Sequence, residues 1–306
     1  MSDFPLSDFP VSDFALGRIG LWTRSLDRLP MAVAQESAAE LEQLGYRTLW
    51  VPEVIGREPL VHAALLLAGT SELIVGAGVA NIYARSAMTM QSAWKTLTEA
   101  FPERFVLGLG VSQAEIVEGL HQQIYGKPYR KMVDYLDEME RATFVGVKPT
   151  TPQRLVLAAL RPRLLRLAAE RSMGAMSYFV PVEHTAWARD ILGTESLLLI
   201  SQAVVIEPDP SNAREIARRY MATYLALPTY ADRLRELGWT EDDLAGPTDA
   251  LVDAVVAWGS PANVALRLRE HLDAGADHVA AQVITADHRA VPLTEWRELA
   301  EAVREI

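Results

Sequence analysis

The sequence contains no cysteine among its 306 residues. Disulfide bonds, thiolate metal sites and cysteine nucleophiles are therefore excluded. Positively charged residues are in the minority, since 29 Lys and Arg oppose 40 Asp and Glu and leave a formal net charge of −11. Because this charge repels nucleic-acid backbones and anionic membranes, we expect neither as a partner.

Long apolar runs and metal-binding motifs are absent as well. No uninterrupted apolar stretch approaches the roughly 18 residues of a membrane-spanning helix, and no basic segment followed by an apolar core marks a secretion signal. His62, His121 and His184 have no histidine four residues away, and the pattern His-Glu-x-x-His does not occur. We therefore expect a cytoplasmic protein without a bound metal or a membrane segment.

Short β-rich segments alternate with longer segments of helical periodicity from Arg18 onward. The apolar strands are nearly continuous, which is typical of parallel strands buried on both faces. About eight such units predict an α/β fold, a (β/α)8 TIM barrel, with an open doubly wound sheet as the alternative. The predicted strands are Ile19–Trp22, Thr48–Pro52, Leu73–Val79, Phe105–Leu109, Leu155–Ala158, Ala175–Val180, Leu197–Ile206 and Val279–Ile284.

Three further segments depart from this alternation. Residues 1–17 contain three copies of a Ser-Asp-Phe unit too short to bury its own phenylalanine, which predicts a flexible leader before a single domain of residues 18–306. In the alternative, the phenylalanines pack on the closed end of the barrel or on a neighbouring subunit. The connections Gln113–Pro128 and Asp209–Pro261 are long, and we predict that both are insertions on the C-terminal face, where the pocket lies.

The densest motif runs from the predicted fourth strand into a glycine-bearing turn. Gly108 and Gly110 match the start of a dinucleotide fingerprint, but Gln113 replaces its third glycine. Ser112 lies in an approximate nucleophile elbow, although Ala114 replaces the last glycine and no glycine-rich oxyanion loop precedes it. A third interpretation is that the backbone N–H groups of this turn bind a phosphate or a ring edge. An ordinary tight turn is also compatible with these residues.

Other candidate residues follow the second, third and fifth predicted strands. Glu53 provides a carboxylate after the second strand, where a helix cap or an ion pair is its commoner role. Asn81 and Arg85 provide donors after the glycine-bearing third strand. After the fifth strand, Pro162 opens a helix beside Arg161, and this helix start is suited to a phosphate.

Six blocks, in order along the chain, resemble the luciferase-like flavin and deazaflavin oxidoreductases, specifically their F420-dependent actinobacterial branch. They extend over most of the chain and fall mainly where predicted strands end. The blocks are Trp50–Glu53, Gly78–Met90, Arg104–Ser112, Leu157–Arg171, Leu227–Tyr230 and Leu272–Val279.

This resemblance implies a cofactor site at the mouth of the barrel. It places a non-proline cis peptide at Gly78–Val79 or an adjacent bond, behind the ring of the cofactor. It also assigns Glu53 to the side of the ring, as the best candidate for a catalytic acid or base, and Asn81 to the ring edge or the substrate. The residues that it implies for cofactor binding are Glu53, Gly78, Val79, Ala80, Asn81, Gly110, Val111, Ser112, Ala159, Leu160 and Arg161.

The resemblance also implies the activity, which is hydride transfer between coenzyme F420 and a small organic substrate by a homodimeric enzyme. Three alternatives remain open at this point: an FMN-dependent monooxygenase, a non-catalytic cofactor-binding or scaffold protein, and a serine hydrolase that uses Ser112. Two residues depart from the pattern of the family. Gln113 stands where relatives often have histidine, and Arg161 stands where they have a small residue.

Overall fold

The computed structural model describes residues 16–306, and the Ser-Asp-Phe repeat lies outside this range. Eight parallel strands form a closed barrel, because each of them has a paired neighbour on both sides, including β1 with β9 and β6 with β7. The predicted (β/α)8 barrel is therefore confirmed, and the open sheet is wrong. The strands of the barrel are β1 (Ile19–Trp22), β2 (Thr48–Val51), β3 (Ile74–Asn81), β4 (Phe105–Gly110), β5 (Arg154–Ala158), β6 (Gly174–Tyr178), β7 (Leu197–Ile206) and β9 (His278–Val283).

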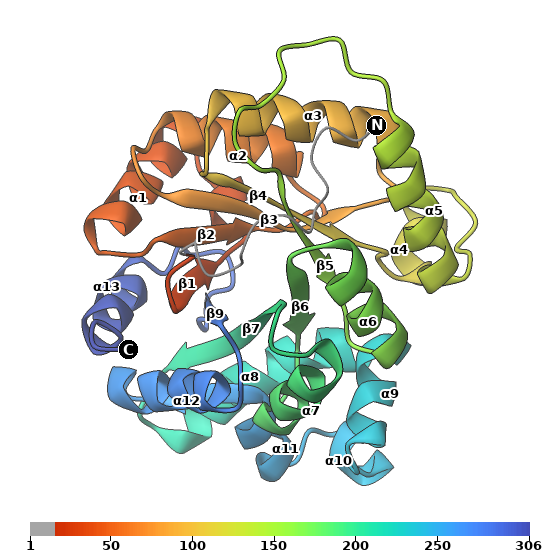
Figure 1. The fold of residues 1–306 in the computed structure, drawn as a ribbon. Coiled ribbons are helices and arrows are strands. Elements are labelled where there is room, and N and C mark those ends of the chain that lie inside the picture. The colour runs from red at the N-terminus through yellow and green to blue at the C-terminus, as the bar shows by residue number, and fades with distance from the viewer. Residues whose placement is uncertain (1–15) are drawn as a thin grey trace.

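Helices surround this barrel on the outside (Figure 1). A short 3-10 helix, Ser25–Arg28, follows β1. The α-helices are α1 (Met31–Gln43), α2 (Pro59–Ala68), α3 (Ala87–Ala100), α4 (Ala114–Gly119), α5 (Pro128–Arg141), α6 (Pro162–Arg171), α7 (Val182–Leu192), α8 (Pro210–Leu225), α9 (Pro228–Glu236), α10 (Glu241–Ala245), α11 (Asp249–Val255), α12 (Pro261–Asp273) and α13 (Leu293–Ala302).

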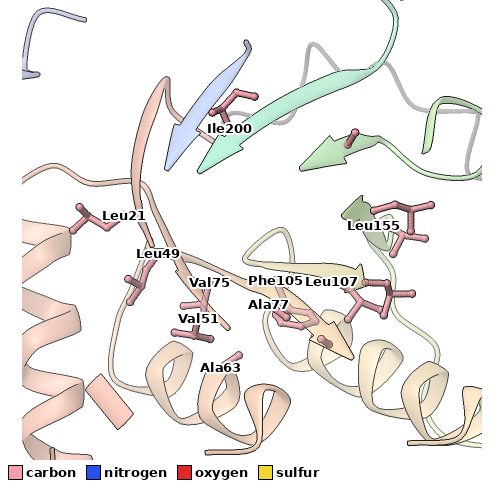
Figure 2. Close-up of a cluster of buried hydrophobic side chains, with 14 of the residues drawn as sticks. Leu21, Leu49, Val51, Ala63, Val75, Ala77, Phe105, Leu107, Leu155 and Ile200 are labelled. Atoms are coloured by element: carbon pink, nitrogen blue, oxygen red, sulfur yellow. The ribbon is translucent and has the colours of Figure 1, made fainter. Parts of the chain in front are cut away.

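Alternate strand residues divide the core into two layers, as the two-residue period of a strand requires. Leu49 and Val51 of β2 belong to the layer between strands and helices, which Figure 2 shows together with Ala63 of α2. Trp50, between them in sequence, belongs to the second cluster, inside the barrel. Gly76 makes room for its indole, because a Cβ there would lie 2.2 Å from Trp50 Cε3.

One short strand was not predicted. Strand β8 (Val256–Gly259) pairs with the last four residues of β7 and extends the sheet beyond the rim of the barrel. Its four residues directly follow helix α11, so they carry no separate alternation signal. The remainder of the 209–261 connection forms α8 to α11, and α9, α10 and α11 gather at one side of the barrel (Figure 1).

Three predicted strands end earlier than expected: β9 by one residue, at Val283, and two others for backbone reasons. Strand β2 stops at Val51, because Pro52 has no N–H to donate to the ladder. Strand β6 stops at Tyr178, because Phe179 has a positive φ of 58°, which does not continue an extended strand.

The N-terminal end of the barrel is sealed by residues that we assigned to the leader. Leu16 is buried in the cluster inside the barrel, and its carbonyl accepts a hydrogen bond of 2.5 Å from Thr48 Oγ1. The carbonyl of Gly17 lies 2.7 Å from His278 Nδ1. These two residues therefore pack against the barrel, and the predicted boundary between leader and domain stays a prediction.

Candidate functional site

The ends of β2, β3, β4 and β5 bring the predicted site residues together at the mouth of the barrel. Asn81 is paired in register with Gly110, and its backbone N–H donates to Glu53 Oε2 over 2.6 Å. The pairing of β3 with β4 shifts between Ala77 and Ala80. The cis peptide bond lies inside this shift, at Gly78–Val79, which confirms its predicted position.

A surface with few side chains lies beside this bulge. Val79 is the only residue of β3 that is not fully buried, and Ala158 is the only such residue of β5. Gly110 lies between them, since a Cβ at this glycine would be 2.6 Å from Val79 Cγ2 and 3.4 Å from Ala158 Cβ. Three neighbouring strands thus end in a low surface that a flat ring fits.

Free backbone donors adjoin this surface. The N–H groups of Val111 and Ser112 follow the end of β4 and have no hydrogen-bond partner within residues 16–306. Ser112 has a positive φ of 55°, and its carbonyl accepts a hydrogen bond from the hydroxyl of Tyr125. Unpaired N–H groups in such a turn are suited to an anionic oxygen, so the turn fits the predicted phosphate-binding role.

The predicted turn after β5 is less open. The N–H of Ala159 donates to Met176 O over 3.0 Å and is therefore engaged in the barrel. Arg161 forms an ion pair with Glu236 of α9, and its Nη2 lies 3.9 Å from Asp232 of the same helix. Its cation therefore links the turn to α9, and this pairing offsets the charge that it could offer to an anion.

Glu53 is held in an ion pair. Arg85 contacts both of its carboxylate oxygens and also reaches Glu58 over 2.9 Å. Together with the hydrogen bond from the Asn81 N–H, this pair braces the β3 bulge against the loop after β2. The predicted role of Glu53 as a catalytic acid or base stays a prediction.

Asn81 is buried, and both ends of its side-chain amide already have partners. Its Oδ1 accepts from the N–H of Tyr83 over 2.9 Å, and its Nδ2 lies 3.2 Å from His121 Nε2. The amide thus stabilises the turn after β3. Its predicted contact with a cofactor or substrate stays a prediction.

The serine hydrolase alternative lacks its base. His184, His271 and His278 follow Ser112 in the sequence, but each ring nitrogen of all three has a partner other than this serine. No contact between Ser112 Oγ and a histidine occurs among the described residues. The positive φ of Ser112 resembles a nucleophile elbow, but an elbow without a base does not activate a hydroxyl.

Sequence reasoning did not find a cluster of tyrosines opposite the bulge. The hydroxyl of Tyr178, at the end of β6, lies 2.6 Å from the hydroxyl of Tyr224 and 2.7 Å from Gln282 Oε1. The hydroxyl of Tyr220 lies 3.0 Å from the hydroxyl of Tyr178 and 3.1 Å from Gln282 Oε1. Tyr230, at the end of the block Leu227–Tyr230 that carries part of the resemblance, packs edge-on against Tyr178. The four-residue spacing of Tyr220 and Tyr224, on one helical face, is the sequence signal for this cluster.

The tyrosine hydroxyls are protonated at neutral pH. Burial raises the pKa of the Tyr178 and Tyr220 hydroxyls well above the ordinary value. The cluster reaches the bulge through Trp22, whose ring centroid lies 5.5 Å from that of Tyr178 and whose Nε1 donates to Gly78 O over 2.6 Å.

A cavity of about 270 Å³ lies beside the tyrosine cluster. The segment after β1, helix α8 and the loop after β9 line it, with Trp22, Tyr220, Tyr224 and Gln282 among its residues. None of the predicted cofactor residues lines it. Trp22 connects the two places, because it lines the cavity and also bonds to the bulge. The mouth of the barrel therefore has a predicted ring-binding surface on one side and a cavity on the other.

Two kinds of feature are absent from the described part of the chain. Within residues 16–306, no helix is both long enough and apolar enough to cross a lipid bilayer. In the same part of the chain, no three His, Asp or Glu side chains are grouped as metal ligands.

Comparisons with known proteins agree with the sequence resemblance. A protein of Mycobacterium tuberculosis, Rv3520c, provisionally named a coenzyme F420-dependent oxidoreductase, is 30% identical over 116 residues. This match covers 38% of the chain and only 33% of that relative.

Solved structures share the fold at low sequence identity. An F420-dependent secondary alcohol dehydrogenase in complex with an F420–acetone adduct superposes with a TM-score of 0.73 at 14% identity, covering 94% of this chain and 99% of the other. The F420-dependent tetrahydromethanopterin reductase of Methanopyrus kandleri has the same score and identity, covering 95% and 99%. The oxygenating component of 3,6-diketocamphane monooxygenase from Pseudomonas putida, in complex with FMN, has a TM-score of 0.70 at 14% identity, covering 94% and 97%.

The model of one family spans most of the sequence. Its description is "Luciferase-like monooxygenase", and it matches residues 12–278. This range includes β1 to β8 and the surface of Val79, Gly110 and Ala158 described above. The chain therefore belongs to the luciferase-like family of oxidoreductases.

Proposed function

We propose that this protein is an F420-dependent oxidoreductase that transfers hydride between the deazaflavin and a small organic substrate. The observation that carries the proposal is the low surface of Val79, Gly110 and Ala158 at the cis-peptide bulge, next to the free N–H groups of Val111 and Ser112. The named F420-dependent relative and structural neighbours support the choice of cofactor.

In this proposal, F420 supplies a carbon that donates or accepts hydride when it is bound. Val79 and Gly110 hold the flat ring, and the N–H groups of Val111 and Ser112 hold its phosphate. The Glu53–Arg85 pair keeps the bulge in place from behind. The tyrosine hydroxyls hold protons at the mouth, since their raised pKa values keep them protonated.

The test is a titration of the purified protein with F420 and with FMN, followed by the fluorescence of each cofactor. We expect saturable binding of F420 and clearly weaker binding of FMN. Saturation by FMN alone would make the protein an FMN-dependent enzyme instead. Binding of neither cofactor, with no turnover over a panel of alcohols, ketones and enones, would favour a non-catalytic role.

A pair of glycine variants tests where the cofactor binds. A Cβ in Gly110→Ala meets Val79 and raises the surface, so we expect F420 affinity to fall about tenfold, a change of about 1.4 kcal/mol. Gly119→Ala, in helix α4, is the matched control, because a Cβ there meets no atom within 4 Å. Equal F420 affinities in the two variants would place the cofactor elsewhere.

A further inference from the structure

The cavity beside the tyrosine cluster has an unusual charge for this protein. No Asp or Glu lines it, although the chain carries 40 of them. Arg24, after β1, and Arg219, on α8, lie on two of its walls, and His288 lies in the loop after β9. The cavity is thus lined by cationic and neutral groups in an otherwise acidic molecule.

Neither arginine is neutralised by the protein. The side chains of Arg24 and Arg219 are exposed and have no ion pair or hydrogen bond within residues 16–306. On the outer side of the same helix α8, Arg214 and Arg218 each form an ion pair with Asp249. The arginines of α8 that face away from the cavity are therefore paired, whereas the one that lines it is free to pair with a ligand.

The floor of the cavity is aromatic and more deeply buried than the rim, which carries exposed arginines. Trp22 and Gln282 are almost fully buried there, and Tyr220 and Tyr224 present their rings and hydroxyls. Burial raises the pKa of both hydroxyls, and the nearby charge of Arg24 offsets part of this rise, so the arginine is close enough to act on a ligand that contacts them. An aromatic floor below a cationic rim matches a ligand with an apolar body and one anionic end.

We propose that this cavity binds the substrate of the enzyme, and that the substrate is a small organic carboxylate. Arg24 and Arg219 bind the carboxylate at the rim, while Trp22 and the two tyrosines hold the apolar body. This assignment rests on the proposed function, because Trp22 links the cavity floor to the bulge on which the cofactor is expected to lie. The two arginines then determine specificity, and the aromatic floor positions the reacting end.

The test is calorimetric titration of the cofactor-free protein at low salt with trans-cinnamate and with its neutral isostere trans-cinnamamide. We expect cinnamate to bind at least about tenfold more tightly, because only its carboxylate accepts a charge-assisted hydrogen bond from the arginines. Arg24→Gln and Arg219→Gln should each weaken cinnamate about tenfold and leave cinnamamide unchanged. Arg166→Gln is the matched control, because Arg166 is also exposed on a helix but lies outside the cavity.

Three results would overturn the assignment. Equal binding of cinnamate and cinnamamide would show that the rim does not recognise charge. Inorganic phosphate that competes as well as cinnamate would show a bare anion site without a place for an organic body. Variants that lose F420 affinity but keep cinnamate affinity would show that the two arginines bind the cofactor and not the substrate. Cinnamate is titrated without cofactor, so the two proposals can fail separately. If F420 does not bind, the proposed function is wrong, but the measured affinity for cinnamate still holds.

Discussion

His184, His271 and His278 are buried, and each ring uses one nitrogen as a donor and the other as an acceptor. Nδ1 of His184 accepts from Arg233 Nε over 2.9 Å, and Nε2 of His278 accepts from Trp50 Nε1 over 3.0 Å. A second proton on either nitrogen would face an N–H donor. Burial lowers the pKa of His184 and His271 to about 3 and that of His278 to about 4, so all three rings are neutral at pH 7.

These pKa values predict a loss of stability in acid. A histidine in the unfolded chain titrates near pH 6.5. Below that pH, the unfolded chain therefore binds more protons than the folded chain, in which these rings stay neutral. The free energy of unfolding should therefore fall as the pH drops from about 6.5 towards 4, by about 1.4 kcal/mol per pH unit for each histidine. Urea unfolding at pH 7, 6 and 5 measures this slope.

His271→Gln provides the control for this prediction. The variant removes one of the three titrating groups, so its stability should depend less steeply on pH than that of the wild type, whatever its stability at pH 7. Identical slopes in the two proteins, or a gain in wild-type stability on acidification, would contradict the assignment of neutral buried histidines.

The sequence predicted single residues with mixed success, for a physical reason. The cis peptide at Gly78–Val79 was located because the family resemblance, which six sequence blocks carry, places it there. The partners of Glu53 were not, because Arg85 reaches it only after β2 and β3 have paired. Residues whose role depends on a neighbour from another element are visible only in the fold.

At the scale of elements, the bulge of β3 and the loop after β2 share one arginine. Arg85 is only 10% exposed and contacts two carboxylates, those of Glu53 and Glu58. Arg85→Gln would leave the partly buried carboxylate of Glu53 without its counter-ion and would remove one partner of the exposed Glu58. We expect the variant to lose about 2 kcal/mol of unfolding free energy and to bind F420 less tightly, because the bulge loses its brace.

The matched change is Arg130→Gln, which breaks the exposed pair of Arg130 with Asp134 on helix α5. Exposed pairs of this spacing contribute about 0.5 kcal/mol or less, so the control should unfold close to wild type. Denaturant unfolding of both variants checks the difference. If Arg85→Gln proves as stable as Arg130→Gln, the bulge does not depend on this ion pair.

The strands themselves were largely predictable, because nearly continuous apolar segments between helical ones are a property of the local sequence. The exceptions were set by the backbone or by the context. Phe179 ends β6 through a positive φ, and β8 exists only because the end of β7 offers it an edge. Propensity carries no information about such an edge.

At the scale of the whole molecule, the inside of the barrel is filled from its N-terminal end. Leu16 is 4% exposed there and packs in the same cluster as Trp50. Leu16→Ala should lower the free energy of unfolding by about 2–4 kcal/mol, through lost burial and the cavity that remains. Leu266→Ala, at a leucine that is 59% exposed on α12, is the control and should change it by less than about 0.5 kcal/mol.

Thermal and urea unfolding of these two variants measure how much Leu16 contributes to the free energy of unfolding. If the Leu16→Ala variant is as stable as Leu266→Ala, Leu16 does not contribute to the core of the barrel. The cavity could not be predicted in the same way, because it exists only where closure of the barrel brings α8, β1 and β9 together.

The barrel can close only late in synthesis of the chain. The contact between Gly17 and His278 joins residues 261 positions apart, and β1 has its second neighbour only when β9 has been made. At about 5–20 residues per second, a ribosome needs more than about ten seconds to span that distance. For all of that time, the nascent chain carries an apolar strand with one open edge, which a chaperone or a wrong strand can occupy first.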